Sequence, residues 1–494
     1  MAGILAQKEF NKKKEENFSE WYNTIIYAAD LADIRYNIQG FVVNRPWAMR
    51  SFKKMYALME KELERDGHEP VSFPTVIPEE NFEIEKEHAE GFSAEVWWVT
   101  HKSKEKLARK LALRPTSETA FYQMYKLWLQ SPADLPYKLY QSCTVFRAEK
   151  ETNPFMRGCE FMWIETHDMF DTEKNARKQI DHDIRIMRDI VEGQMAMPFY
   201  VFRRPHWDKF AGGEETYAFD TRMPDGKAFQ FATTHLLGQN FTKAFDVKYK
   251  NTEGQDEYPY TTCFGPGIWR FMAALVSIHG DDKGLIFPWS VAPMQIVIVP
   301  IYRDEETRVK LVQKCEEIKQ YLQENNISVV CDFSEKTPGF KFNHWELRGV
   351  PLRIEMGGKE LAENKLTVAR RDNREKTQLN ASLNEELLES IREIGGKLTN
   401  ELYARASKEL KDNLADCHSK EDVVKALNSK KYARAPFCSN EASGANCAQQ
   451  VQEFTKGGKV RGILFEKKET PKTTDKCIEC KEKANVLVYI ARQY

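Results

Sequence analysis

The stretch RPTSET at residues 114–119 places three hydroxyl groups and one carboxylate behind an Arg-Pro pair. Pro115 has no N–H group and restricts the residue before it, so the chain is expected to leave regular structure here. Thr116 and Glu118 are two residues apart, and in an extended loop their side chains would point to the same side. Two acceptors on one side suit a cationic group with two N–H donors. Taken alone, the stretch favours the alternative of a helix N-cap at Thr116 or Ser117, with Glu118 in the first turn.

A second set of chemically active residues follows a strand pattern between residues 136 and 170. The segments YKLYQSCTVFRAE and EFMWIETHDMF are expected to pair as a long antiparallel hairpin. A face that mixes arginine, glutamate, histidine and tryptophan is costly to bury as core and too aromatic for solvent, which favours a ligand site over a structural polar network. The residues expected to share strand faces in this way are Arg147 with Glu149, and Phe161, Trp163, Glu165 with His167.

A glycine-rich loop at 265–267 leads to Arg270, at the expected start of an apolar helix. Glycine permits close backbone approach, and an arginine in this position can bind a phosphate or stack on a ring. Taken alone, the loop is better explained as a tight turn followed by a surface arginine. The sequence has no P-loop, no strand–GxGxxG–helix unit and no serine nucleophile elbow. A nucleotide would therefore have to bind an antiparallel sheet whose arginines hold a bent ATP.

Length and composition indicate the number of domains, the kind of partner and the compartment. A chain of 494 residues suggests about three domains. The 73 basic and 74 acidic residues nearly cancel, so a nucleic-acid partner must be bound by local patches. The N-terminus lacks an apolar stretch long enough for a signal peptide, and prolines interrupt the most apolar region, 286–302. We expect a cytosolic protein that does not enter a membrane.

The elements that must position the reactive residues fall into three regions. Residues 1–288 combine a helix over 44–66, the first hairpin and a second hairpin that turns at Pro224-Asp225-Gly226, which indicates an α+β domain built on an antiparallel sheet with flanking helices. Strands and helices alternate over 289–396, which predicts a small α/β domain. Residues 397–494 are expected to form a small third domain, and this region holds five of the ten cysteines.

Four of these cysteines suggest a metal site, since ten cysteines in a chain without a signal peptide indicate reduced thiols or metal ligands. Cys438, Cys447, Cys477 and Cys480 have the spacing CX8C–X29–CX2C. The CX2C half is typical of zinc knuckles, whereas the other half is loose, and free thiols are the alternative. The remaining cysteines lack such clustering and are expected to be buried thiols: Cys143, Cys159, Cys263, Cys315, Cys331 and Cys417.

The ordered set of motifs resembles a known family. FRAE at 146–149 resembles motif 2 of the class II aminoacyl-tRNA synthetases, the helix at 44–66 with SFPTVIP resembles motif 1, which forms the dimer interface, and GPGIWRF resembles motif 3. RPTSET, EFMWIETH, KFAGG, THLLGQNF and PGFKFNHWELRGVPLRIE together resemble the prolyl-tRNA synthetases of the archaeal and eukaryotic type, over nearly the whole chain. The resemblance implies a homodimer that activates L-proline with ATP and Mg²⁺ and transfers it to tRNA(Pro).

The resemblance also implies roles for individual residues. Thr116 and Glu118 would hold the secondary ammonium of proline, with Trp163 and Phe210 as pocket walls. The further residues expected around proline are Arg147, Glu165, His167 and His235. For ATP, Arg147 would contact the α-phosphate and the proline carboxylate, Glu149 the adenine amino group, Phe161 and Arg270 the two faces of adenine, Arg157 the outer phosphates, and Gln230 with Thr233 the ribose and metal–phosphate region. Arg147 and Arg270 are the expected catalytic residues.

Outside the catalytic domain, the resemblance makes 289–396 an anticodon-binding domain, with Lys341, Trp345, Glu346 and Arg348 as candidate contacts to unstacked bases. A charged surface helix is an equal alternative for each of these residues separately. It makes the four clustered cysteines ligands of a structural Zn²⁺, and it implies that the carboxylate of Tyr494 folds back towards the active site.

One departure from the family pattern and one absent segment bear on specificity. Motif 3 contains Pro266, Ile268 and Trp269 where small residues are more usual. No large insertion separates motifs 2 and 3, where bacterial-type relatives carry an editing domain. A pocket for proline excludes amino acids of similar or smaller size by only about 1–3 kcal/mol. We therefore expect measurable activation of alanine or cysteine, and an absence of pyrophosphate exchange above background with both would contradict this.

Two other functions would require different residues. A non-catalytic tRNA-binding paralogue would not need the ATP set of Arg147, Glu149, Phe161 and Arg270. A threonyl-type enzyme would be expected to use a metal to recognise a hydroxyl group, and the slot between Trp163 and Phe210 does not suit it.

Overall fold

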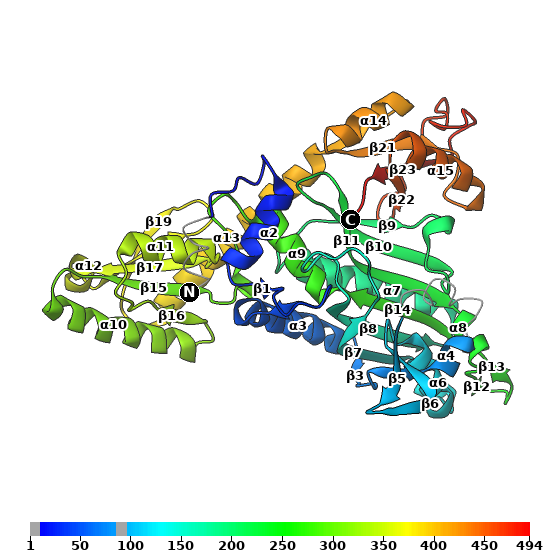
Figure 1. Cartoon of the computed structure of the whole chain (residues 1–494), viewed down its shortest axis with the longest axis horizontal. Helices are drawn as coiled ribbons and strands as arrows, with labels where there is room; N and C mark the ends of the chain where they lie inside the picture. Colours follow the sequence, from blue (N-terminus) through cyan, green and yellow to red (C-terminus); the bar gives the residue numbers. More distant parts are fainter. Residues whose placement is uncertain (1–9, 85–95) are drawn as a thin grey trace.

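The computed structural model describes residues 10–84 and 96–494, and it has the α+β architecture expected from the sequence (Figure 1). The domain that the resemblance predicts to be catalytic, called the catalytic domain below, contains a large sheet. It lies between a small α/β domain on one side and a C-terminal domain on the other. Among the described residues, no helix is both long and apolar enough to cross a membrane.

One eleven-stranded sheet runs through the first and third domains. All neighbours pair antiparallel except β20 with β21 and β3 with β7. In spatial order its strands are β20 (Leu414–Asp416), β21 (Tyr432–Phe437), β23 (Val486–Ala491), β22 (Lys459–Leu464), β9 (Tyr200–Arg203), β10 (Glu215–Arg222), β11 (Ala228–Gly238), β14 (Tyr260–Pro266), β8 (Glu160–Phe170), β7 (Tyr137–Phe146) and β3 (Glu69–Pro70).

Both predicted hairpins are confirmed within this sheet. β7 and β8 pair over ten positions, with Leu139 opposite His167 and Cys143 opposite Trp163. β10 and β11 form the second hairpin, and Gly226 in its turn has a φ of 86°, in the left-handed region that favours glycine. The alternation along β8 therefore directs Trp163, Glu165 and His167 to one face of the sheet, as predicted.

Helices cover the other face of the sheet. The predicted helix over 44–66 is α3 (Pro46–Arg65), with Pro46 at its first position and Phe52, Met55, Met59 and Leu63 buried. α3 packs on α9 (Ile268–His279), which is buried along nearly its whole length. The glycine-rich loop predicted at 265–267 is mostly strand, because pairing with β11 extends β14 to Pro266 and leaves only Gly267 before the helix. α7 (Glu173–Met187), continued by a π-helical turn at Arg188–Glu192, packs on β8, β11 and β14.

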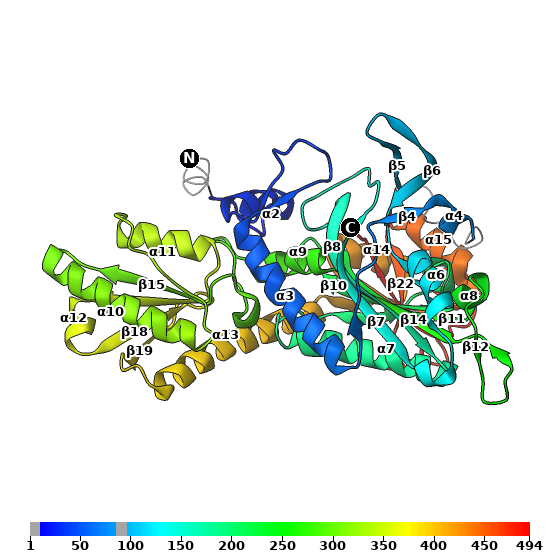
Figure 2. The same ribbon diagram turned by 90° about the horizontal axis from the view of Figure 1, so that it is seen from below.

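Shorter elements complete the catalytic domain. They are α2 (Phe18–Ala28), β1 (Ala32–Asp33), β2 (Val43–Asn44), β4 (Val76–Pro78), α4 (Glu79–Glu83), β5 (Trp97–Lys102), β6 (Glu105–Leu113), α6 (Glu118–Trp128), α8 (Asn240–Ala244), β12 (Tyr249–Lys250) and β13 (Asp256–Glu257). β4, β6 and β5 form a separate three-stranded sheet, and the β5–β6 hairpin projects from the body of the molecule (Figure 2).

The α/β domain has a five-stranded mixed sheet. β15 (Ile296–Ile301) pairs parallel with β16 (Val329–Cys331) and with β17 (Leu352–Gly357), whereas β18 (Lys365–Arg370) and β19 (Lys376–Asn380) continue the sheet antiparallel. Its helices are α10 (Glu305–Glu324), α11 (Pro338–Leu347) and α12 (Gly358–Ala362).

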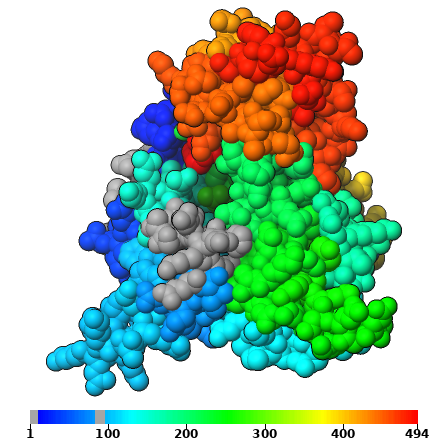
Figure 3. Space-filling view, turned by 90° about the vertical axis from the view of Figure 1, so that its right-hand side faces the viewer, coloured from blue at the N-terminus to red at the C-terminus, as the bar shows by residue number. Residues whose placement is uncertain are grey.

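The C-terminal domain is tied to the other two. The 28-residue helix α13 (Glu385–Asp412) runs from the α/β domain to the C-terminal domain, so the boundary predicted at 396/397 lies inside one helix. The remaining helices here are α14 (Lys420–Asn428) and α15 (Ala445–Phe454). Because β22 pairs with β9, the two domains share one sheet, and the C-terminal domain (orange and red) sits directly on the catalytic domain in Figure 3.

Candidate active site

A cavity of about 350 Å³ lies on the open face of the large sheet. Its walls come from β8, β11, β14, the start of α6 and the loop after β9. All eight residues predicted to surround proline line it, one of which, Arg147, was also predicted to bind ATP, and two further predicted ATP residues do so as well: Thr116, Glu118, Arg147, Trp163, Glu165, His167, Phe210 and His235, with Gln230 and Thr233. The sequence therefore located one site from segments that are more than 100 residues apart.

The structure shows both features proposed for RPTSET. Ser117 occupies the N-cap position of α6 and Glu118 lies in the first turn, but the Ser117 side chain does not cap the helix. The Ser117 Oγ atom instead donates to Glu165 Oε1 at 2.6 Å. Thr116 Oγ1 donates to the Glu118 carboxylate, so the two acceptors are side by side at the cavity. A carboxylate at a helix N-terminus is also favoured by the helix dipole.

Glu165 is the centre of a buried hydrogen-bond network. It accepts from Ser117 N at 3.1 Å and from Gln141 Nε2 at 2.8 Å, and His167 Nε2 lies 3.3 Å from its Oε2 atom. Burial acts to raise the pKa of Glu165, but the hydrogen bonds from His167, Ser117 and Gln141 outweigh it and lower the pKa to about 2. For His167, burial acts to lower the pKa, while the hydrogen bond to Glu165 and the charge of Glu118 raise it. The floor of the cavity thus holds a fixed carboxylate.

His235 and Phe210 form the opposite wall. Their ring centroids are 4.9 Å apart. The His235 Nδ1 atom lies 2.9 Å from Thr216 Oγ1, and its Nε2 atom lies 3.0 Å from Thr233 Oγ1. Burial, together with the charge of Arg204, lowers the pKa of His235 to about 3. The imidazole is therefore neutral at physiological pH, and its edge is held by two hydroxyl groups.

We expect the stability of the protein to depend on pH between 6 and 4 through its buried histidines. His235 and His279 both have a pKa of about 3 in the folded chain, below the usual 6.5, because they are buried. The stabilisation from each is complete above pH 6.5 and is lost as the pH falls towards 3, by about 1.4 kcal/mol per pH unit. Asp183 acts in the opposite direction, since burial raises its pKa to about 7 and its proton favours the folded state below that pH.

Substitution of His279 by asparagine tests this dependence outside the active site. His279→Asn should reduce the loss in the free energy of unfolding between pH 6 and pH 4 by about 1.4 kcal/mol per pH unit. Urea unfolding at pH 6, 5 and 4 measures it. Parallel pH curves for the variant and the original chain would show that His279 is not held neutral.

Three arginines gather beside the cavity. The Arg147 guanidinium lies 5.3 Å from the ring centre of Phe161 and 5.5 Å from that of Trp163. Arg270 Nη1 donates to the Gln230 carbonyl at 2.8 Å, and burial, with the charges of Arg147 and Arg157, lowers the pKa of Arg270 to about 10. Such a concentration of positive charge favours a polyphosphate.

The structure corrects one prediction at this point. Arg147 and Glu149 do not share a face of the strand, because β7 ends at Phe146 and both residues lie in the turn that follows. Glu149 N donates to the Arg147 carbonyl at 2.8 Å, and the Glu149 carboxylate lies 3.7 Å from Arg157. The chain leaves the sheet there because the partner strand begins only at Glu160.

The unusual residues of motif 3 face away from the cavity. Ile268 and Trp269 are buried in the core, and the Trp269 ring packs on Phe155 with centroids 5.4 Å apart. Trp269 Nε1 donates to Asn44 Oδ1 at 3.0 Å. These side chains anchor α9 to the motif 1 region and do not narrow the cavity.

The sequence did not predict a buried series of hydrogen bonds and ion pairs that joins the cavity to the C-terminal domain. Arg204, which lines the cavity, donates to the Gln230 side chain, and its Nη2 atom lies 3.4 Å from Asp220. Asp220 also accepts from Arg461 of β22 at 2.7 Å, and Arg461 donates to Gln493, which lines the cavity as well. No sequence signal links residues that lie 241 positions apart.

Gln493 lines the cavity and Tyr494 lies at the β10–β11 turn, while the approach of the Tyr494 carboxylate to the active site stays a prediction. Tyr494 N donates to the Ala228 carbonyl at 3.2 Å, and its hydroxyl donates to Asp225 at 2.7 Å. Gln493 forms a bridge with Ala228 at the start of β11.

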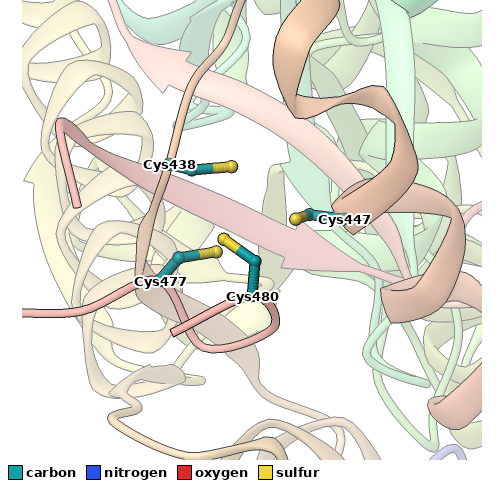
Figure 4. A group of neighbouring side chains, drawn as sticks. All are labelled: Cys438, Cys447, Cys477 and Cys480. Carbon is teal, nitrogen blue, oxygen red and sulfur yellow. The ribbon is translucent and has the colours of Figure 1, made fainter. Parts of the chain in front are cut away.

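The four clustered cysteines converge in the C-terminal domain. Their sulfur atoms lie within 4.8 Å of one another and point towards a common centre (Figure 4). Cys447 is presented by α15, and Cys477 and Cys480 by the turn before β23. Four converging thiols are a donor set that fits tetrahedral Zn²⁺. Of the other six cysteines, four are buried, and Cys143 and Cys331 are half-buried.

The candidate anticodon residues lie on α11 and at its end, and each has a partner within the protein. Lys341 Nζ donates to the Asp332 carbonyl at 2.9 Å, and Trp345 Nε1 donates to the Asp332 carboxylate at 2.8 Å. Glu346 accepts from Arg353 at 3.1 Å. Arg348 pairs with Asp30 of the catalytic domain. Their role in binding tRNA stays a prediction.

Comparison with known proteins identifies the class first. The model of the class II tRNA synthetase core domain (G, H, P, S and T) matches residues 97–279, and that of an anticodon-binding domain matches 295–393. The fold is that of a class II aminoacyl-tRNA synthetase. A third model, for the C-terminal domain of prolyl-tRNA synthetase, matches residues 420–494.

Relatives that match over nearly the whole length of this chain then identify its family. The proline--tRNA ligase of Thermofilum pendens is 48% identical over 491 residues, covering 99% of this chain and 100% of the relative. The Giardia lamblia prolyl-tRNA synthetase in complex with prolyl-adenylate superposes with a TM-score of 0.93 at 32% identity, covering 98% of this chain and all of that one. The Cryptosporidium parvum prolyl-tRNA synthetase complexed with halofuginone and AMPPNP gives 0.90 at 31% identity, over 98% and 96%. The chain belongs to the prolyl-tRNA synthetase family.

Proposed function

We propose that this protein activates L-proline with ATP to prolyl-adenylate and transfers proline to the 3′ end of tRNA(Pro). The observation that carries the proposal is the single cavity that brings together all eight residues expected around proline, in a chain of this family. The solved relative that holds prolyl-adenylate supports the same chemistry.

In this proposal the two acceptors of RPTSET select the amino acid. The secondary ammonium of proline has two N–H donors and one positive charge, and Thr116 with Glu118 offers a hydroxyl and a carboxylate at one side of the cavity. The apolar ring of proline lies between Trp163 and Phe210, with the neutral His235 beside it. The Glu165 network holds Ser117, and therefore the start of α6, in place.

The reaction needs positioning and charge stabilisation more than a side-chain nucleophile. The proline carboxylate attacks the α-phosphate of ATP, the bond to the β-phosphate breaks, and pyrophosphate leaves. The terminal hydroxyl of tRNA(Pro) then attacks the mixed anhydride, and AMP leaves. In this proposal Arg147 contacts the α-phosphate and the carboxylate, and the charges of Arg157 and Arg270 nearby support the assignment. Mg²⁺ is expected to accompany ATP because its phosphates need a hard cation.

ATP–pyrophosphate exchange with each of the twenty amino acids, without tRNA, tests the proposal. We expect exchange that is strongest with proline. Silence with all twenty in a folded protein that still binds tRNA would overturn it in favour of a non-catalytic tRNA-binding protein. In the same assay, weaker exchange with alanine or cysteine is expected, because the cavity offers little to reject them.

The remaining assignments are the oligomeric state, the tRNA contacts and the compartment. A homodimer is supported by apolar residues that are exposed near motif 1: Ile34, Tyr36, Ile38, Val43, Trp97 and Trp98. The loop after α2 and the β5–β6 hairpin project from the same side in Figure 2, and Phe41 packs on Trp97 with ring centroids 5.6 Å apart. The α11 residues would meet the proline anticodon, and translation in the cytosol is the expected setting.

For the four-cysteine cluster we propose structural zinc. Cys480→Ser should lower the zinc content by one equivalent and the free energy of unfolding by about 3–5 kcal/mol, a part of the roughly 10–16 kcal/mol with which structural zinc binds at neutral pH. Elemental analysis and urea unfolding measure the two effects. Cys417→Ser, at a buried thiol of the same domain outside the cluster, is the matched control and should keep its zinc. Equal zinc contents in the two variants would contradict the assignment.

A further inference from the structure

A second convergence of metal-binding side chains lies inside the active-site cavity. Glu118, His167 and Cys263, which we call the pocket trio, each present one ligand-type atom, and these atoms lie within 4.8 Å of one another. All three side chains are buried, with exposed fractions of 6%, 1% and 6%. Cys263 on β14 stands directly opposite His167 on β8. A carboxylate, an imidazole and a thiol are the side chains that bind Zn²⁺.

Two members of the pocket trio are held by a neighbour through one polar atom and keep a second one. Thr116 donates to Oε2 of Glu118, and the Cys263 thiol lies 3.8 Å from the other oxygen, Oε1. His167 Nε2 is 3.3 Å from Glu165, while its Nδ1 atom is buried and has no hydrogen-bond partner. A histidine held by a carboxylate through one nitrogen, with the other nitrogen free, is the usual arrangement of a zinc ligand.

The spacing suits a metal better than a hydrogen-bond network. Bonds of 2.0–2.3 Å to zinc place neighbouring ligands about 3.5 Å apart in a tetrahedron. The sulfur–oxygen distance of 3.8 Å is close to that value and long for a hydrogen bond. An unpaired buried nitrogen such as His167 Nδ1 is rare in native structures and indicates a missing partner.

We propose that the pocket trio is a three-ligand site for Zn²⁺, and that zinc and proline exclude each other because both need Glu118. The exclusion rests on the proposed function, whereas the metal site itself does not. Three protein ligands leave a fourth position open towards the cavity, which a water molecule can fill. Zinc would thus inhibit proline activation.

Zinc stoichiometry tests the site on the full-length protein. After dialysis against buffered free zinc, the original chain should hold one equivalent more than Cys263→Ser. Cys143→Ser is the matched control, because Cys143 lies 3.4 Å from Glu165 beside the same cavity but outside the pocket trio, and it should bind as many equivalents as the original chain. Equal zinc contents in the original chain and Cys263→Ser would overturn the proposal.

A non-hydrolysable prolyl-adenylate analogue provides a test that needs no substitution. Saturating the original chain with it should remove one zinc equivalent, and retention of all zinc in the presence of bound analogue would overturn the exclusion. In pyrophosphate exchange, zinc should raise the apparent KM for proline about tenfold at a free concentration about nine times its Kd, with kcat unchanged. A fall in kcat alone would contradict competition. Absence of exchange with Mg²⁺ present and no added zinc, in protein that keeps its four-cysteine zinc, would instead contradict the proposed function, and the zinc contents would still report on the site.

Discussion

Arg147→Ala is expected to reduce proline-dependent pyrophosphate exchange by about 10²–10³-fold in kcat/KM, the usual effect of removing one charged group that stabilises a transition state. The Arg147 guanidinium is held against the faces of Phe161 and Trp163, and it lines the cavity beside Thr116 and Glu118. From this position Arg147 is expected to contact both the carboxylate of proline and the α-phosphate that the carboxylate attacks. The loss should therefore appear in kcat as well as in KM.

Two further variants make this result specific. Arg147→Lys should recover little activity, since a lysine cannot offer two parallel N–H donors or stack on the two rings. Arg177→Ala is the matched control, because Arg177 is a half-exposed arginine of α7 that pairs with Glu173 and Glu215 away from the cavity. It should keep nearly full activity. If Arg147→Ala kept more than about a tenth of the exchange, the placement of the transferred phosphate beside this residue would be wrong.

The parts of the site that could be predicted depend on local spacing. Alternation along one strand placed Trp163, Glu165 and His167 on one face, because a side chain cannot change faces without a shift in register. Resemblance then added residues from other segments, such as His235 on β11, which spacing alone would have assigned to a structural role. Together they named eight residues that the structure brings into one cavity, and their contact with proline stays a prediction.

The predictions failed where the end of a strand, or a segment far away in the sequence, determines the contacts of a residue. The two-residue spacing of Arg147 and Glu149 continues the strand pattern. β7 nevertheless ends at Phe146, one residue before Arg147, because its partner strand β8 begins only at Glu160, opposite Phe146. Cys263 could have been found, since it lies two residues before Gly265 on the strand that carries motif 3. The contact of Arg461 with Asp220 could not, because nothing in either segment indicates that the C-terminal domain adds strands to the catalytic sheet.

Arg461→Met is expected to destabilise the protein by about 3–5 kcal/mol, the cost of removing one partner from a buried ion pair. Arg461 is 2% exposed and Asp220 is fully buried, with 2.7 Å between them. The variant leaves Asp220 with Arg204 alone, at 3.4 Å. Urea unfolding measures the loss. Arg434→Met is the matched control in the same domain, since its partners Asp416 and Glu469 form a partly exposed pair worth about 1 kcal/mol or less.

Arg461→Met should also impair the use of ATP. Arg204 is fixed by Asp220 and by the Arg461 carbonyl, and it holds the side chain of Gln230. The main-chain carbonyl of Gln230 accepts from Arg270. When Asp220 loses Arg461, we expect Arg204 to turn towards it and release Gln230, which should lower kcat/KM for ATP by about ten- to hundredfold. The KM for proline should change less, because Thr116 and Glu118 are held from α6 and not through Gln230.

The double variant Arg461→Met/Asp220→Asn separates charge from packing. Without the carboxylate no uncompensated buried charge remains, so the double variant should be more stable than Arg461→Met alone, which is the sign of a coupled pair. Its activity should stay low, because Arg204 would still lack the acceptor that orients it towards Gln230. Additive losses in stability, or ATP kinetics equal to those of Arg434→Met, would show that the C-terminal domain does not position the ATP site through Arg461.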